Sequence, residues 1–109
     1  MTFGEFRKSA AGTGTVVPPG LSPALQALWH EAHGDWEQAH GIAQNDQTPE
    51  GSWVHAYLHR REGDAGNAGY WYARAGRPAV ETAAEEEWTS IARALLVKPL
   101  GDRGLPCGA

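Results

Sequence analysis

Two stretches of this sequence repeat one another: LWHEAHGDWEQAHGIAQ at residues 28–44 and YLHRREGDAGNAGYWYA at residues 57–73, an offset of 29 positions. In each stretch a helix-like segment is followed by Gly-Asp and then by a second helix-like segment with an alanine four places after the Asp. Glycine permits a left-handed turn, aspartate caps a new helix, and alanine lets two helices pack closely. The repeated phrase therefore predicts an antiparallel helical hairpin that occurs twice. The identical pairs are His30 and His59, Gly34 and Gly63, Asp35 and Asp64, and Ala39 and Ala68.

Apolar spacing and capping residues extend this pattern to five helices. Ser22-Pro23 and Thr48-Pro49 each place a cap residue before a proline, which is typical of a helix start. After the second hairpin, residues of about 79–97 carry early acidic and late basic side chains, as the helix dipole favours. We therefore expect an all-α fold of five helices, in which two tetratricopeptide-like hairpins are followed by a long C-terminal helix. Each expected helix contains one of the five Trp residues, which predicts one bulky core anchor per helix.

The two ends of the chain differ in composition from its middle. Residues 1–20 are rich in Gly, Ser, Thr and Pro without an apolar period, which predicts an irregular or mobile leader. Residues 21–98 form the expected helical domain, and the Gly/Pro-rich residues 99–109 a flexible tail. Cys107, the one cysteine, lies in that tail and has no partner for an internal disulfide.

The composition argues against several classes of function. The 109 residues carry a formal net charge of −4, and no basic face that would bind nucleic acid is evident. No run of 18 or more apolar residues could cross a membrane, and the N-terminus has no stretch of signal-peptide length. We therefore expect a cytoplasmic protein with no nucleic-acid or membrane partner.

The second repeat also resembles known helical repeats. EGDAGNAGYWYARAG, at residues 62–76, is similar to the second half of tetratricopeptide and Sel1-like repeats, in which Gly-Asp precedes a helix carrying Ala and Tyr. The segments HGDWEQAH, WVHAYLHRREGD and NAGYWYARAG resemble a group of small, functionally uncharacterised bacterial proteins. This resemblance covers under half of the chain and implies a helical fold without an activity.

Histidines provide the strongest candidate chemistry. His55, His59 and Glu62 fall at i, i+4 and i+7 of one expected helix, so both imidazoles could reach one ion. A further ligand could come from His33 or His40 of the first hairpin. Three protein ligands plus water is the pattern of a catalytic zinc, and histidine-carboxylate sets also suit iron. The alternative is that these histidines are polar packing residues, paired with carboxylates or backbone carbonyls.

The repeat separates the two histidines of the HxxxH pair. His59 has a counterpart in His30, so structural repetition alone could explain it. Gln26 stands at the position equivalent to His55. We therefore expect His55 to be the histidine whose presence needs a functional explanation.

Aromatic and basic side chains suggest a binding surface. Tyr70 lies off the apolar stripe of its helix and one turn from Arg74, and Arg60 adds a further positive charge. Exposed tyrosine and arginine are typical of binding hot spots. The sequence thus favours a protein-interaction or scaffold module, with self-association as one form of it. A metal-binding protein, with enzymatic activity as a further option, is the alternative.

Overall fold

The computed structural model describes residues 1–14 and 16–103, with side chains as far as Leu96, and all of its regular structure is helical. No strand occurs within these described residues, so the all-α prediction is confirmed. No described helix is long and apolar enough to span a bilayer. The helices are α1 (Phe3–Ala11), α2 (Pro23–Ala32), α3 (Trp36–Gln44), α4 (Pro49–Arg61), α5 (Ala65–Ala75) and α6 (Ala84–Arg103).

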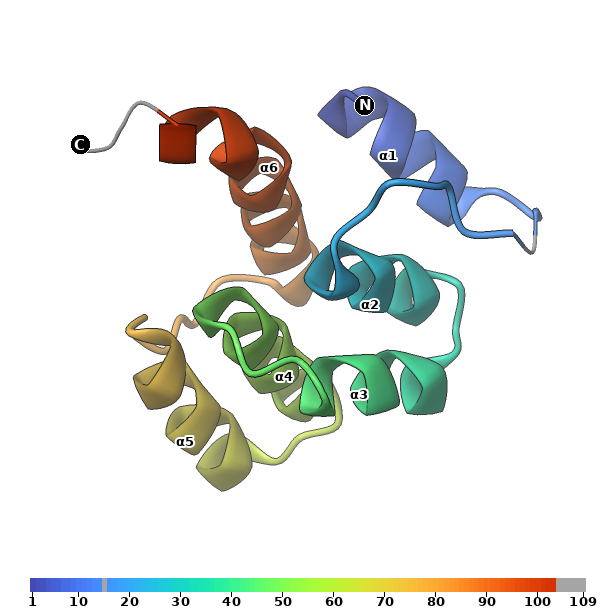
Figure 1. Ribbon diagram of the computed structural model, residues 1–109. Coiled ribbons are helices and arrows are strands. Elements are labelled where there is room, and N and C mark those ends of the chain that lie inside the picture. The colour runs from blue at the N-terminus through green and yellow to red at the C-terminus, as the bar shows by residue number, and fades with distance from the viewer. Residues whose placement is uncertain (15, 104–109) are drawn as a thin grey trace.

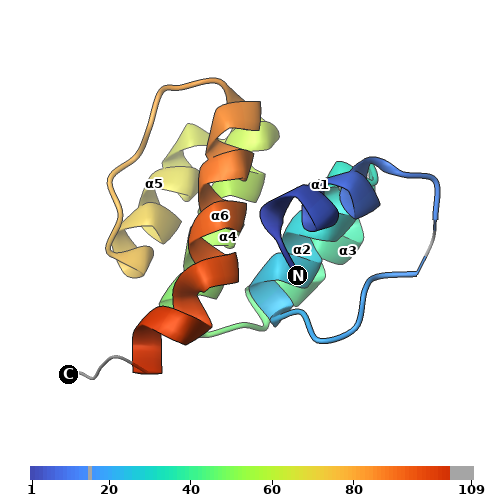
Figure 2. The ribbon, with the colours of Figure 1, turned by 90° about the horizontal axis from the view of Figure 1, so that it is seen from above.

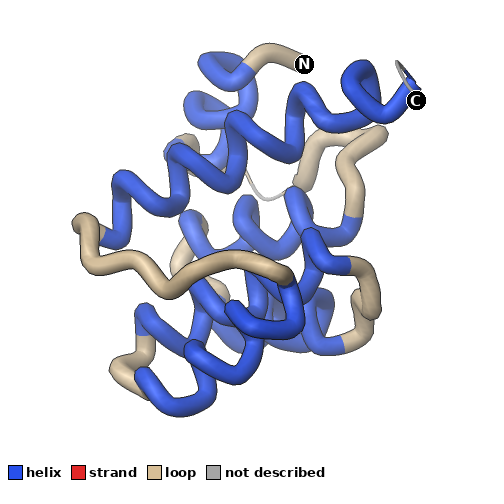
Figure 3. The backbone as a smooth tube through the Cα atoms, turned by 90° about the vertical axis from the view of Figure 1, so that its left-hand side faces the viewer, coloured by secondary structure: helices blue, strands red, loops and turns tan. Residues whose placement is uncertain are grey.

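The helices are arranged around α4. Figure 1 shows α1 and α6 along the top of the molecule, α2 and α4 in the middle, and α3 and α5 at the bottom. Seen from above, α6 lies over α4 and α1 lies over α2 (Figure 2). The connection from α5 to α6 runs across one side of the molecule (Figure 3). As a result α4 packs against α2, α3, α5 and α6.

The repeated Gly-Asp phrase forms the same turn twice. Gly34 and Gly63 have φ angles of 84° and 87°, in the left-handed region. After each glycine, the aspartate N–H donates to the carbonyl five residues earlier, at 2.9 Å in both turns. Each aspartate side chain then accepts a backbone N–H of the following helix at 3.1 Å. This is a Schellman turn followed by an N-cap, and it reverses the chain so that α3 packs on α2 and α5 on α4.

The core is filled by large side chains from several helices. Trp29, Tyr57 and Phe6 are the largest of the fully buried residues. The indole N–H of Trp29 donates to Ser9 Oγ at 3.0 Å, which ties α2 to α1. Buried tryptophans need such partners for their polar atom. Two other tryptophans, in α3 and α5, are only half-buried, and both lie against the histidines described below.

The N-terminal helix α1 corrects the expectation of an irregular leader over residues 1–20. Thr2 and Glu5 form a reciprocal capping box that satisfies two otherwise free N–H groups. Phe6 and Ala10 are buried, 0% and 2% exposed, against the rest of the core. The helix is thus stabilised by a cap and by tertiary burial, which outweigh the Gly/Thr-rich composition of the segment.

The last helix also differs from its expected bounds. It begins at Ala84 rather than near residue 79 and ends at Arg103, inside the segment expected as a tail. Three consecutive acids, Glu85 to Glu87, occupy its first turn, where the helix dipole favours negative charge. Residues 104–109, with Cys107, lie outside the described residues.

Replacing the turn glycine tests whether the Gly-Asp phrase holds the fold together. Gly63→Ala is expected to lower the free energy of unfolding by about 1–2 kcal/mol, because an L side chain is strained at positive φ. Gly69→Ala is the matched control, since Gly69 is exposed within α5 and an added Cβ meets no atom within 4 Å. It should stabilise the protein by about 0.5–1 kcal/mol. Urea unfolding of the two variants measures both effects, and equal behaviour would contradict the role given to the turn.

Candidate metal centre

Three histidines from two helices meet at one point. His40 comes from α3, and His55 and His59 come from successive turns of α4. One ring nitrogen of each lies within 4.8 Å of the ring nitrogens of the other two. The Nε2 atoms of His40 and His55 are 3.0 Å apart, and the rings of His55 and His59 stack with centroids 4.9 Å apart. The structure therefore brings together the i, i+4 pair, His55 and His59, and one of the two histidines expected as a further ligand, His40.

The helix ends place these side chains in register. Thr48 caps α4 by accepting the N–H of Gly51 at 3.1 Å, and Pro49 follows it at the first helical position. Asp35 caps α3 by accepting the N–H of Gln38. The indole N–H of Trp36, the first residue of α3, donates to the carbonyl of Leu58 on α4 at 3.1 Å. This bond fixes α3 against α4 at the level of the histidines.

Two indole rings form walls of the cluster. Trp36 stacks on His40 with centroids 4.7 Å apart and an interplanar angle of 12°. Trp71, from α5, stacks on His55 at 4.0 Å and 23°. Since His55 is 3% exposed and His59 9% exposed, the cluster lies largely inside the protein. The stacked indoles limit ring rotation and exclude water from two sides.

Glu62 lies beside His59 rather than at the centre of the cluster. Its Oε1 is 2.7 Å from His59 Nδ1. This hydrogen bond holds Nδ1 and leaves Nε2 of His59 as the nitrogen available to a metal. A carboxylate on the far nitrogen is the usual support of a metal-binding histidine, because it fixes the tautomer and raises ligand basicity. The expected third-ligand role of Glu62 thus becomes an orienting role.

A second acidic grouping has weaker prospects as a site. Ligand atoms of His59, Glu62 and Asp64 also lie within 4.8 Å of one another. However, Asp64 accepts the backbone N–H of Asn67 at 3.1 Å and its side-chain N–H at 2.8 Å. Both carboxylate oxygens of Asp64 therefore serve to cap α5, which makes Asp64 a poor candidate for a metal ligand.

The electrostatics of the cluster favour the neutral form of two of its imidazoles, His40 and His55. Burial, together with the neighbouring His40 and His59, lowers the pKa of His55 to about 4. Burial and His59 also lower the pKa of His40, against an opposing effect of Glu62. Neutral imidazoles offer lone pairs, so a metal would not have to displace protons from these two rings at neutral pH. Nδ1 of His55 is buried and has no hydrogen-bond partner among the described residues.

The remaining sequence-predicted residues lie elsewhere. His33 ends α2, where its Nε2 is 2.7 Å from the carbonyl oxygen of Gly14 and its ring stacks on Trp29 at 3.8 Å. It is therefore not part of the cluster. His30, the repeat counterpart of His59, also lies outside the cluster and packs edge-on against Trp29.

The predicted binding residues separate into two kinds. Arg60 donates to the buried carboxylate of Glu87 at 2.6 Å and to the carbonyl of Thr82. It therefore links α4 to α6 and to the segment that precedes α6. Tyr70 is 55% exposed, and Arg74 NH1 lies 3.4 Å from its hydroxyl. Of the three residues expected on a binding surface, Tyr70 and Arg74 are exposed to solvent and Arg60 is half-buried.

The indole walls are the part of the site that the sequence analysis missed. Trp36 and Trp71 were interpreted there as core anchors, one per helix. Their incomplete burial and ring stacking on histidines depend on how α3 and α5 pack on α4, which local periodicity does not specify. Comparisons of the chain with protein-family models, curated proteins and solved structures found no match. The interpretation of the site therefore rests on the geometry of this chain.

In the absence of metal, the protein is expected to lose stability as the pH falls from about 6.5 to about 4. The pKa of His55 is near 6.5 in the unfolded chain and about 4 in the folded protein. Between these two pH values the imidazole is protonated mainly in the unfolded chain, and this uptake of a proton shifts the equilibrium toward unfolding. The loss should be roughly 1–3 kcal/mol, complete below the folded pKa and absent above the unfolded one. Urea unfolding in the presence of a chelator, over this pH range, measures it.

His55→Leu is the control for this pH dependence, since it removes the titrating ring and keeps an apolar side chain against Trp71. The variant should show a flatter dependence of unfolding free energy on pH. A slope equal to that of the unaltered protein would show that His55 is not the group responsible.

Proposed function

We propose that the protein binds a divalent transition-metal ion through His40, His55 and His59. The observation that carries the proposal is the convergence of three imidazole nitrogens within 4.8 Å in a largely buried, aromatic-walled position. The 3.0 Å contact between the Nε2 atoms of His40 and His55 accommodates only one proton, so a neutral pair has a lone pair there. A bound cation provides a favourable interaction for the lone pairs that meet there.

The spacing of the nitrogens suits a small cation. Imidazole nitrogens bind zinc at about 2.0–2.1 Å, which sets tetrahedral ligands about 3.3 Å apart. The Nε2 atoms of His40 and His55 are already close to that separation, at 3.0 Å. The third ring needs only to close on the pair from within 4.8 Å.

The ligand set favours particular metals. Three neutral nitrogen donors suit zinc and, among redox-active ions, copper, nickel or iron. Calcium and magnesium prefer oxygen donors and do not fit a set of three imidazoles. A trihistidine set leaves a fourth coordination position for water or another small ligand.

A second candidate function is a protein-interaction module, which the exposed side of α5 favours. The guanidinium of Arg74 lies 5.9 Å from the Tyr70 ring centroid and 5.3 Å from that of Trp71. An exposed tyrosine held by an arginine over an indole is an arrangement typical of binding hot spots. Trp71 also stacks on His55, so this surface adjoins the histidine cluster. The tetratricopeptide-like pattern of the sequence supports the same proposal.

The metal proposal predicts that purified protein takes up one zinc ion per chain and is stabilised by it. Ligand binding to the folded state raises the free energy of unfolding by about 2.7 kcal/mol at a hundred times the dissociation constant. His55→Ala should weaken zinc binding by about 100-fold or more, since it removes a ligand rather than a supporting partner. Elemental analysis, calorimetric titration and the visible absorption of a cobalt-substituted sample measure this.

Two further variants make the result specific. His40→Ala removes the half-buried ligand from α3 and should behave as His55→Ala does, while circular dichroism checks that each variant stays folded. His30→Ala removes the repeat counterpart of His59, which lies outside the cluster, and should bind zinc normally. Absence of stoichiometric uptake, or equal loss in His30→Ala, would contradict the proposal.

The interaction proposal predicts that Tyr70→Ala loses a partner without losing stability. Its free energy of unfolding should change by less than about 0.5 kcal/mol, because the ring is largely exposed. Val80→Ser is the matched control, since Val80 is another exposed apolar residue, 37% exposed, that lies outside α5. A protein retained by the unaltered chain and by Val80→Ser, but not by Tyr70→Ala, supports the surface. Equal retention by both variants contradicts it.

A further inference from the structure

A cavity of about 380 Å³ lies on the side of α4 that faces away from the histidines. Tyr57 and Arg61 of α4 line it, together with side chains of α1, α2 and α6, and no histidine does. Successive residues of a helix are rotated by about 100°, so Tyr57 points about 200° away from His55. The volume is within the range of small-molecule sites, about 300–1,000 Å³.

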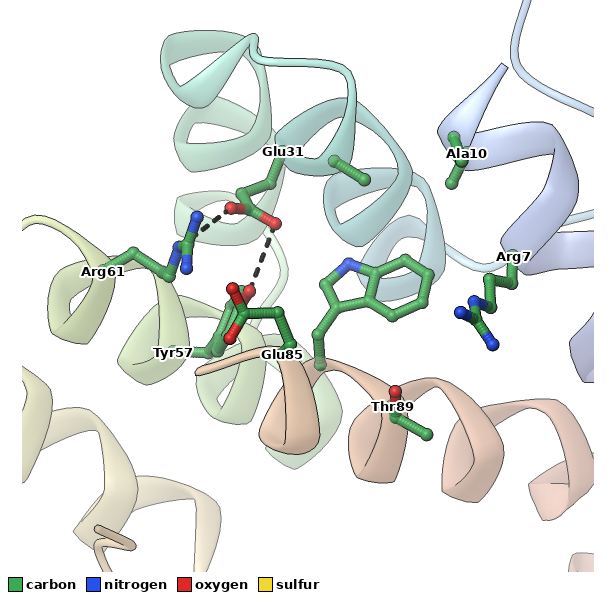
Figure 4. A pocket seen from close by; sticks show the side chains of 10 residues that line it. Arg7, Ala10, Glu31, Tyr57, Arg61, Glu85 and Thr89 are labelled. Carbon is green, nitrogen blue, oxygen red and sulfur yellow. Dashed lines mark hydrogen bonds and ion pairs between the residues drawn. The ribbon is translucent and has the colours of Figure 1, made fainter. Parts of the chain in front are cut away.

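A buried polar group forms one end of this cavity. Glu31, whose side chain is 10% exposed, accepts the hydroxyl of Tyr57 at 3.3 Å, and its other carboxylate oxygen forms an ion pair with Nε of Arg61 at 3.2 Å. Glu85, at the start of α6, lies on the same side of the cavity (Figure 4). Two carboxylates and one guanidinium leave this end with a net negative charge. Burial raises the pKa of Glu31, although Arg61 opposes the shift, so a nearby cation would be favoured there.

The opposite end of the cavity is positive. Figure 4 shows the guanidinium of Arg7, from α1, across the cavity from Glu31 and Glu85, with Thr89 between the two ends. Neither Arg7 nor Glu85 makes an ion pair with another described side chain. Between the charges the lining is mainly apolar, from Trp88 and three alanines.

We propose that this cavity binds a small zwitterion whose ammonium and carboxylate groups are separated by an apolar chain, of the class of an ω-amino acid. Its ammonium group meets Glu85 and Glu31, its carboxylate meets Arg7, and its apolar part lies against Trp88. A purely anionic ligand would place its charge near two carboxylates, and a purely cationic one would leave Arg7 without a counter-charge. The separation of charge within one cavity is therefore matched by a ligand that is itself dipolar. This site is distinct from the proposed metal centre and does not depend on it.

Titration of the metal-free protein with 6-aminohexanoate tests the proposal. The probe signal is the indole N–H of Trp88 in isotope-labelled protein, which donates to the carbonyl of Leu28 at 3.1 Å beside the cavity. We expect saturable shifts with a dissociation constant of the order of 1 mM. 6-Acetamidohexanoate lacks the ammonium group and 6-aminohexanamide lacks the carboxylate, and each should bind about tenfold more weakly.

Two variants test which charged group of the ligand each charged side chain binds. Arg7→Gln should bind 6-aminohexanoate about as weakly as the unaltered protein binds the amide, and Glu85→Gln should bind it about as weakly as the unaltered protein binds the N-acetylated compound. Glu86→Gln is the matched control, because Glu86 is an exposed neighbour on α6 that does not line the cavity. No saturation up to about 20 mM, equal affinity for the three compounds, or an equal effect of the three variants would overturn the proposal. Since a chelator is present throughout, the outcome is independent of metal binding.

Discussion

The rest of the structure depends on α4 being surrounded by other helices. Every residue from Gly51 to His59 is buried, yet this segment carries several polar side chains. A helix with no solvent-facing side must give each buried polar group a partner. Apart from Nδ1 of His55, which has no partner among the described residues, the helix does this on opposite faces. His55 and His59 face α5 and α3, while Tyr57 donates a hydrogen bond to Glu31 of α2 and Arg61 forms an ion pair with it. Both proposed sites therefore arise where the central helix has to satisfy its polar atoms.

The features that the sequence predicted are those set by local chemistry. Gly-Asp turns, Ser-Pro and Thr-Pro helix starts and the HxxxH spacing are all encoded within a few residues, and they led to the all-α fold and to His55 with His59. The sequence even offered a signal for α1, since Phe3, Phe6 and Ala10 have helical spacing. That signal is short, and its helix is stabilised by burial against α2 and α6, which composition alone does not indicate.

The parts that could not be predicted are those that depend on how helices meet. Both His33 and His40 were candidates in sequence, with His40 favoured by its place on the apolar stripe, and the packing of α3 on α4 brings His40 to the pair. Arg60 was expected on a binding surface, but α6 brings the buried Glu87 to it, and Tyr72 donates to the same carboxylate at 2.5 Å. The cavity likewise joins Arg7 with residues far along the chain. Such groupings come from tertiary contacts, so they carry no pattern in the sequence.

The indole walls of the histidine cluster give the protein an internal optical reporter. Trp71 lies 4.0 Å from the ring of His55, and Trp36 lies 4.7 Å from the ring of His40. At such distances the excited state of an indole is sensitive to the charge of the adjacent imidazole and to any ion bound to it. The emission of these two tryptophans therefore follows the state of the cluster without an added dye.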